Sequence, residues 1–127
     1  MELRGINERD LGRFYSEFQN VDLTGMIEVV RLLRQTPWEG AVYTLTSHAA
    51  LVLLAESHSS GTRWVTIDPW RQSGYEVRYR LPDSEAPWPE TQCGGIADTP
   101  ERAVQMAVLG MRLCRAWETT NPTSEPL

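Results

Sequence analysis

Cys93, which stands before a pair of glycines, is the residue of this sequence whose type and surroundings best suit covalent chemistry. Paired glycines permit tight backbone geometry, and successive N–H groups there can bind an anion. A thiol nucleophile would also need a base, His48 or His58, and an orienting carboxylate such as Asp68. Spacing along the chain does not show that these side chains meet. The simpler interpretation is a turn with a half-buried cysteine, so a Cys93-dependent thiol enzyme is the third functional hypothesis.

The two histidines do not predict a metal site with Asp68 or Cys93. His48 and His58 stand at opposite ends of a predicted strand over 49–55. An extended strand of that length separates them by roughly 25–30 Å, whereas zinc ligands lie about 2 Å from their ion. We therefore expect the histidines to be turn residues, and we expect no metal and no cofactor.

Composition limits the function classes. The chain has 127 residues and a net charge of −5, which suits one domain and argues against nucleic acid as a partner. All 12 basic residues are arginine, so Schiff-base chemistry and a P-loop lysine are excluded. No apolar run is long enough to span a membrane, and residues 1–10 lack the apolar stretch of a signal peptide. We expect a cytoplasmic protein in which Cys93 and Cys114 are free thiols.

Residues 40–81 predict the strands around which the remaining elements pack. Strands are expected over 41–46, 49–55, 63–67 and 75–81, the second buried on both faces because it is a continuous apolar run. Asp68-Pro69 is expected to end the third strand. The fourth alternates, with Tyr75, Val77 and Tyr79 on one face and Arg78 on the other. The short loops favour an antiparallel meander.

Helices are expected on both sides of this stretch. An i, i+3, i+4, i+7 stripe beginning at Leu11 predicts a helix over about 8–19, and a similar stripe predicts one that Thr36-Pro37 ends. A strand over 27–33 is the alternative for the second. Thr99-Pro100 opens a last helix that runs to about 117. Segment 82–98 is interpreted as a loop, with an edge strand at 91–96 as the alternative, and 119–127 as a disordered tail.

The predicted fold is therefore α+β, as a single domain over 1–118. Two N-terminal helices precede a four-stranded antiparallel meander, and a C-terminal helix packs on one face to complete a two-layer sandwich. The antiparallel sheet leaves its other face for solvent or a partner.

Aromatic and arginine side chains supply the candidate binding residues. Aromatic residues near arginine are enriched at recognition surfaces, and an arginine pair can hold a carboxylate or phosphate. The alternatives are tryptophans that cover the sheet ends and charges on a solvated sheet face. The candidates for ligand or partner binding are Trp64, Trp70, Arg78, Arg80 and Trp88.

The last predicted helix is apolar over an arc of roughly 240°, wider than the stripe that a surface helix needs. Small residues along its middle, among them Gly110, would let it lie close on the sheet. The N-terminal helices can cover one larger flank, Val104 with Met111. We expect a second copy of the chain to cover the other flank, which consists of Met106, Leu109 and Leu113.

The favoured function is a non-enzymatic protein-interaction module, with a homodimer as the expected assembly. Small, acidic, two-layer α+β proteins with aromatic surfaces are typical of bacterial immunity, inhibitor and mobile-element accessory proteins, although no motif here assigns residues to such a role. The second hypothesis is a small-ligand binder, with a pocket between helices and sheet lined by Trp64, Arg78 and Tyr79.

Overall fold

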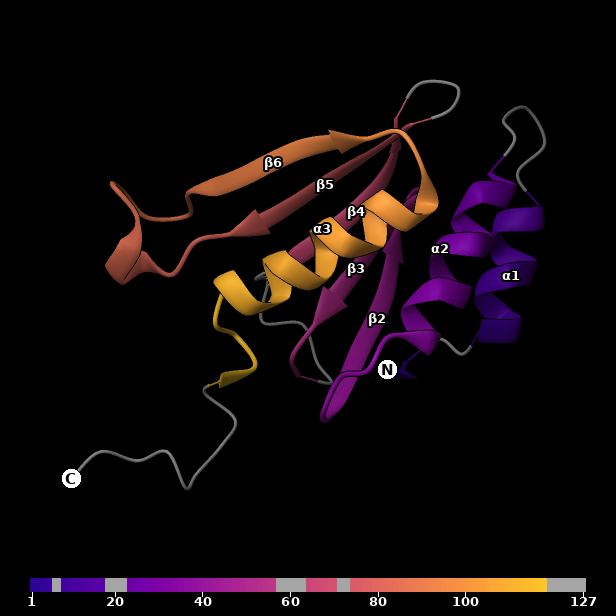
Figure 1. Cartoon of the computed structure of the whole chain (residues 1–127), viewed down its shortest axis with the longest axis horizontal. Helices are drawn as coiled ribbons and strands as arrows, with labels where there is room; N and C mark the ends of the chain where they lie inside the picture. The colour runs from indigo at the N-terminus through magenta and orange to yellow at the C-terminus, as the bar shows by residue number, and fades with distance from the viewer. Residues whose placement is uncertain (6–7, 18–22, 57–63, 71–73, 119–127) are drawn as a thin grey trace.

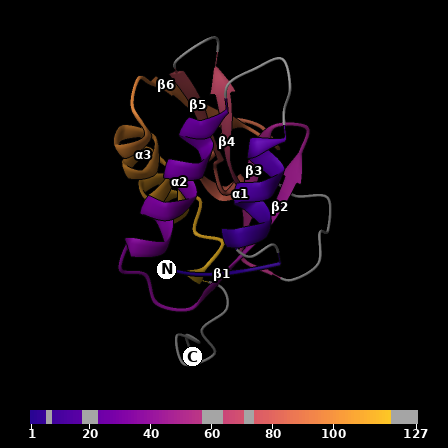
Figure 2. The ribbon, with the colours of Figure 1, turned by 90° about the vertical axis from the view of Figure 1, so that its right-hand side faces the viewer.

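The computed structural model describes residues 1–5, 8–17, 23–56, 64–70 and 74–118. Its core element is a six-stranded mixed sheet in the order β1-β2-β3-β4-β5-β6, in which β1 and β2 are parallel and all other neighbours are antiparallel. The strands are β1 Glu2–Arg4, β2 Ala41–Ser47, β3 Ala50–Leu54, β4 Val65–Trp70, β5 Gly74–Arg80 and β6 Gln92–Ala97. The helices α1 Glu8–Ser16, α2 Thr24–Gln35 and α3 Pro100–Leu113 cover one face of the sheet (Figures 1 and 2).

The α+β class is confirmed, but the sheet has six strands and is mixed, whereas four antiparallel strands were expected. The meander β2–β5 is present, and a strand is added at each edge. At one edge, β1 precedes the helices and pairs in parallel with β2, and it is too short to show an alternating pattern. At the other edge, β6 confirms the alternative of an edge strand at 91–96 within the segment whose first interpretation was a loop. Its two glycines dilute the strand signal of the sequence.

Pro69 does not end β4, contrary to expectation. The strand continues through Pro69 to Trp70, and Pro69 pairs with Tyr75 of β5. The Arg80 N–H donates to the Trp64 carbonyl at 2.9 Å, so alternation along the ladder turns the Pro69 nitrogen toward β3. Pairing between β3 and β4 stops at Ile67, so the missing N–H of Pro69 costs no ladder hydrogen bond.

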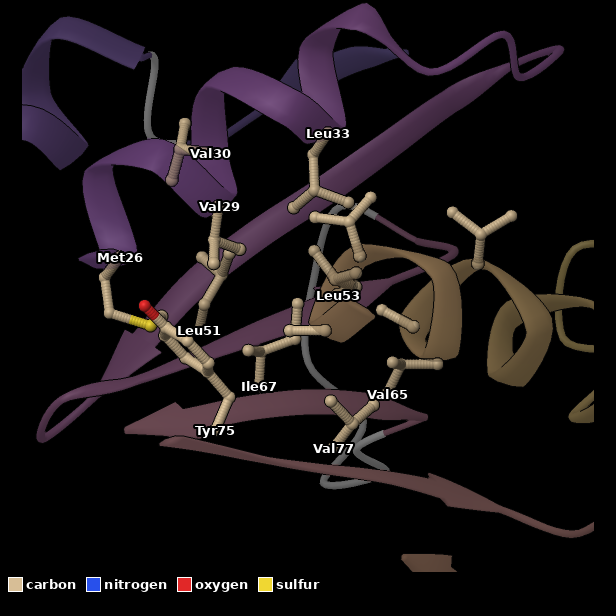
Figure 3. Packing of buried hydrophobic residues seen from close by; sticks show 14 of the residues in the cluster. Met26, Val29, Val30, Leu33, Leu51, Leu53, Val65, Ile67, Tyr75 and Val77 are labelled. Carbon is tan, nitrogen blue, oxygen red and sulfur yellow. The ribbon is translucent and has the colours of Figure 1, made fainter. Parts of the chain in front are cut away.

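The core lies between the sheet and the helices, where Ile67 and Tyr75 lie toward the apolar stripe of α2, and Val65 and Val77 lie nearer α3 (Figure 3). The alternation of β5 therefore predicted its buried face correctly. β3 is buried along its whole length, as its continuous apolar run indicated. Leu51 and Leu53 belong to the core, whereas Val52 faces away from the helices and is nevertheless fully buried.

Helices α1 and α2 form because each has one apolar stripe. In α1, Leu11 and Tyr15 are buried, and the Tyr15 hydroxyl donates to the Ala49 carbonyl at 3.0 Å. The expected end of this helix at 18–19 lies outside the described residues. The second helix is α-helical over 27–33, so the strand alternative is wrong, and its C-cap is Thr36, directly before Pro37.

Helix α3 begins as predicted and ends earlier than predicted. The Thr99 hydroxyl accepts a hydrogen bond from the Arg102 N–H at 3.1 Å, and Pro100 is the first helical residue. The helix ends at Leu113, short of the expected 117. The predicted tail 119–127 lies outside the described residues. Within the described ranges, no helix has the length and apolar character that crossing a membrane requires.

Candidate functional site

The sheet face opposite the helices carries most of the predicted binding residues. Alternation along β4 and β5 turns Trp64 and Arg78 to this face, while Val65 and Val77 enter the core. No helix of the described chain covers it. The neighbouring pairs across β4 and β5 on this face are Trp64 with Arg80, Thr66 with Arg78, and Asp68 with Glu76.

A pocket of about 160 Å³ opens on this helix-free face. Trp64 and Arg78 line it together, as the ligand-binding hypothesis expected, whereas Tyr79 borders it but carries its side chain on the helix face, where Gly110 lies over it. A pocket between helices and sheet was expected, but this one lies on the other face, because strand alternation points Trp64 and Arg78 away from the helices. The lining residues are Ala50, Trp64, Thr66, Asp68, Arg78, Tyr79 and Gln92.

The pocket brings opposite charges close together. Arg78 bonds Glu76 at 2.9 Å and keeps about half of its side chain exposed. Burial raises the pKa of Asp68 above its usual range, and the Glu76 charge acts in the same direction. Arg78 and His48 oppose that shift without cancelling it. The pocket therefore offers both a carboxylate and a guanidinium to a ligand that carries both charges.

Arg80 is held by its neighbours and is less available than Arg78. Its guanidinium carbon lies 5.4 Å from the centre of the Trp64 ring, and it also bonds Asp83 at 3.2 Å. Asp83 belongs to the short 3₁₀ helix Asp83–Glu85 that follows β5. The structure thus makes Arg80 a support for the Trp64 ring, which forms one wall of the pocket.

Trp70 and Trp88 do not join Trp64. Trp70 ends β4, six residues from Trp64, and is 38% exposed. Trp88 follows the 3₁₀ helix and is 67% exposed, and its carbonyl accepts a hydrogen bond from the Thr91 hydroxyl at 2.6 Å. The five candidates therefore form one cluster, Trp64 with Arg78 and Arg80, and two separate exposed tryptophans.

A second surface is the flank of α3 beside β6, formed by Met106, Leu109 and Leu113. Leu109 is 53% exposed and Leu113 is 41% exposed. Met106 is half-buried because its side chain packs on Gly95 of β6. A Cβ added to Gly95 would lie only 2.8 Å from the Met106 Cε. The opposite flank of the helix is covered, since Val104 and Met111 are buried in the core.

Among the described residues, no histidine lies beside Cys93 to act as the base that the thiol-enzyme hypothesis needs. The Cys93 side chain neighbours Tyr79, and burial together with the Cys93 thiol raises the pKa of Tyr79. His48 lies in the turn between β2 and β3, at least three strand spacings away from Cys93, or about 14 Å. His58 lies outside the described residues. No three metal-ligating side chains come together in the part of the chain that the structure describes.

Four of the lining residues were not among those expected for a pocket, namely Ala50, Thr66, Asp68 and Gln92. Thr66 lies in the predicted third strand on the same face as Trp64, and extending that strand through Pro69 adds Asp68 at the same two-residue spacing. Gln92 belongs to β6, which the sequence offered only as the alternative of an edge strand over 91–96.

Comparison with known proteins gives no relative: no family model, curated protein or solved structure matches this chain. Its function is therefore inferred from the two surfaces above, the pocket of the helix-free face and the exposed flank of α3.

Proposed function

We propose that this chain is a non-enzymatic protein-interaction module that works as a homodimer. The observation that carries the proposal is the exposed leucine pair on α3, Leu109 and Leu113, beside the outer strand β6. Exposed apolar groups that are contiguous on a surface mark sites of protein association more often than scattered single residues do. Because the other flank of α3 is already covered, only this flank remains for a partner.

A second copy suits this flank because the same patch can cover itself. In a two-fold dimer each copy presents the same residues, so Leu109 and Leu113 of one copy would meet those of the other. Full burial of one leucine side chain contributes about 1.5–3 kcal/mol. The four leucines of the dimer are already partly buried within each copy, so each of them contributes less than this amount. Backbone pairing along the neighbouring strand would add further contacts.

The assembly is tested by placing the same charge at two exposed positions, one on the free flank of α3 and one on α2. Leu109→Arg introduces a cation into the proposed interface. Gln35→Arg introduces one at an exposed position near the end of α2 and serves as the matched control. Light scattering after size exclusion is expected to give a dimer for the unmodified chain and for Gln35→Arg, and a folded monomer for Leu109→Arg. A Leu109→Arg variant that remains dimeric would contradict the proposal.

Binding of a small ligand is a second candidate function, favoured by the pocket of the helix-free face. Trp64 provides an aromatic wall, Thr66 and Gln92 provide hydrogen-bonding groups, and Asp68 and Arg78 provide opposite charges. A volume of about 160 Å³ suits only a small molecule. Complementarity to both charges favours a zwitterion of the size of a free α-amino acid.

Calorimetric titration with each of the twenty common amino acids tests this second candidate. We expect saturable heat with at least one of them, lost in Arg78→Ala and kept in Arg31→Ala. Arg31 is the control because it is an exposed arginine bonded to Glu28 on α2, away from the pocket. The absence of saturable heat from every titration would remove this candidate.

A further inference from the structure

No strand among the described residues pairs with the outer edge of β6, and the ladder shows which backbone groups point out of that edge. The Leu81 N–H donates to the Thr91 carbonyl at 3.0 Å, which makes these two residues a hydrogen-bonded pair. Backbone groups alternate along an antiparallel ladder, so every second residue of β6 turns its N–H and C=O toward β5. The residues whose groups point away from the sheet are Gln92, Gly94 and Ile96.

This edge lacks the features that usually prevent pairing. Natural edge strands are protected by charges, prolines, bulges or shortness. The six residues of β6, QCGGIA, include no charge and no proline. By contrast, the opposite edge strand β1 has three residues, of which Glu2 and Arg4 are charged. The β6 edge is therefore suited to pairing with another strand.

The exposed flank of α3 lies on the side of this edge. Met106 packs on Gly95 of β6, while Gly110, one turn further along, packs on Tyr79 of β5. The flank that continues from Met106 to Leu109 and Leu113 thus faces the β6 side, and the flank of Val104 faces α2, where Val104 and Leu32 line one groove. The free strand edge and the exposed leucines are parts of one surface.

We propose that a second copy of this chain pairs its β6 with β6 of the first, antiparallel, about a two-fold axis at Gly94. The inference rests on the homodimer proposed above and specifies how it forms. With the axis at Gly94, the two Gly94 residues face each other and Gln92 faces Ile96 of the second copy. All outward N–H and C=O groups of the two strands then have partners, which registers centred elsewhere do not achieve.

The pairing makes one continuous sheet and brings the two α3 helices together. Three strand spacings separate β5 of one copy from β5 of the other, about 14 Å. The α3 helices lie on the same face of the joined sheet, and the side chains of Leu109 and Leu113 from both copies fill the space between them. On the opposite face, Ile96 of the second copy lies beside Gln92 and borders the pocket. The second copy thus contributes a residue to the rim of the pocket.

Amide hydrogen exchange of the full chain, followed by NMR, tests the pairing. The N–H groups of Gln92, Gly94 and Ile96 are expected to exchange at least about tenfold more slowly in the dimer than in the monomeric Leu109→Arg variant. The N–H groups of Cys93 and Gly95, bonded to β5, serve as the internal control and are protected in both. A dimer in which Gly94 exchanges freely would overturn the pairing and leave the homodimer standing, and a monomeric unmodified chain would overturn both.

Cross-linking gives a second measurement on the folded protein. Gln92→Cys combined with Ile96→Cys, in a Cys93→Ser background, is expected to form a covalent dimer when oxidised with diamide, because paired residues lie about 5.5 Å apart. Ile96→Cys alone in the same background is expected to stay uncross-linked, since the two Ile96 positions lie about 13 Å apart in this register. Equal cross-linking of the single and double variants would overturn the register.

Discussion

Gly110 of α3 lies directly on Tyr79 of β5: a Cβ on Gly110 would come within 2.9 Å of the Tyr79 Cβ. Two carbons of the Tyr79 ring, Cγ and Cδ1, would lie 3.2 Å from the same added Cβ. Because the Tyr79 Cβ is fixed to the strand, a larger residue would have to push the helix away from the sheet. The close approach of α3 to the sheet therefore depends on this glycine, and the approach also determines where Leu109 and Leu113 stand.

Gly110→Ala is expected to destabilise the protein by about 1–3 kcal/mol, as overpacking does. This loss outweighs the gain of about 1 kcal/mol in helix propensity. Gly12→Ala in α1 is the control, because nothing lies within 4 Å of the added Cβ, and it is expected to stabilise slightly. Urea denaturation of both variants decides the matter. Equal stabilisation by the two alanines would show that the contact with Tyr79 is not tight.

The two faces of β5 are expected to respond differently to mutation. Val77 is 3% exposed, so Val77→Asp buries an unpaired carboxylate and is expected to cost more than about 3 kcal/mol. Arg78 is half-exposed on the helix-free face, and Arg78→Ala is expected to cost less than about 1 kcal/mol. Chemical denaturation measures both values. Similar losses would mean that an additional layer covers the helix-free face.

Asp68 is expected to make the protein less stable as the pH rises. Its pKa is raised in the folded state, chiefly by partial burial, so the folded protein holds this proton more tightly than the unfolded chain. Its contribution is therefore lost as the pH rises from the unfolded pKa, about 3.9, through the raised folded value. Because Asp68 is exposed and solvent screens its charge, Asp68→Asn should raise Tm only slightly at pH 7 and make little difference at pH 3. A lower Tm at pH 7 for Asp68→Asn would show that the charged form is favoured in the fold.

Cys93 and Cys114 are expected to react at different rates with iodoacetamide. Cys93 is half-buried in the edge strand, whereas Cys114 is 2% exposed and burial raises the pKa of its thiol. The thiolate is the reactive form, so mass spectrometry of the native protein should find Cys93 modified first. Modification of Cys114 first would place the C-terminal end of α3 away from the core.

The sequence predicted the elements whose patterns are long and failed where neighbouring strands supply the information. Val77 and Leu33 were placed correctly because each belongs to a regular alternation or stripe. β6 was only the second interpretation of its segment because glycine has no side chain to reveal a strand, and its pairing with β5 provides the stabilisation. Pro69 was expected to end the strand because proline cannot donate a ladder hydrogen bond. Whether a hydrogen bond is lost depends on which neighbouring strand the Pro69 nitrogen faces and how far that strand extends, and the sequence does not show either.

The candidate site was predicted only in part, because strand alternation is visible in the sequence whereas the packing of the helices on one face is not. The sequence identified Trp64 and Arg78 and even placed Trp64 opposite Val65. Placing the pocket on the correct face required knowing that all three helices cover the other one. The helical wheel identified Leu109 and Leu113 as members of one of two flanks that could stay uncovered, but the packing of Val104 and Met111 in the core decides that this flank is the exposed one.

The molar mass of the unmodified chain in solution is the most direct test of a two-fold dimer built on α3 and β6. Light scattering across about 1–100 µM is the measurement, because the mass of a specific dimer rises with concentration and then stops at one value. A two-fold dimer predicts a plateau at twice the chain mass of 14.4 kDa. A mass of 14.4 kDa at every concentration would contradict it.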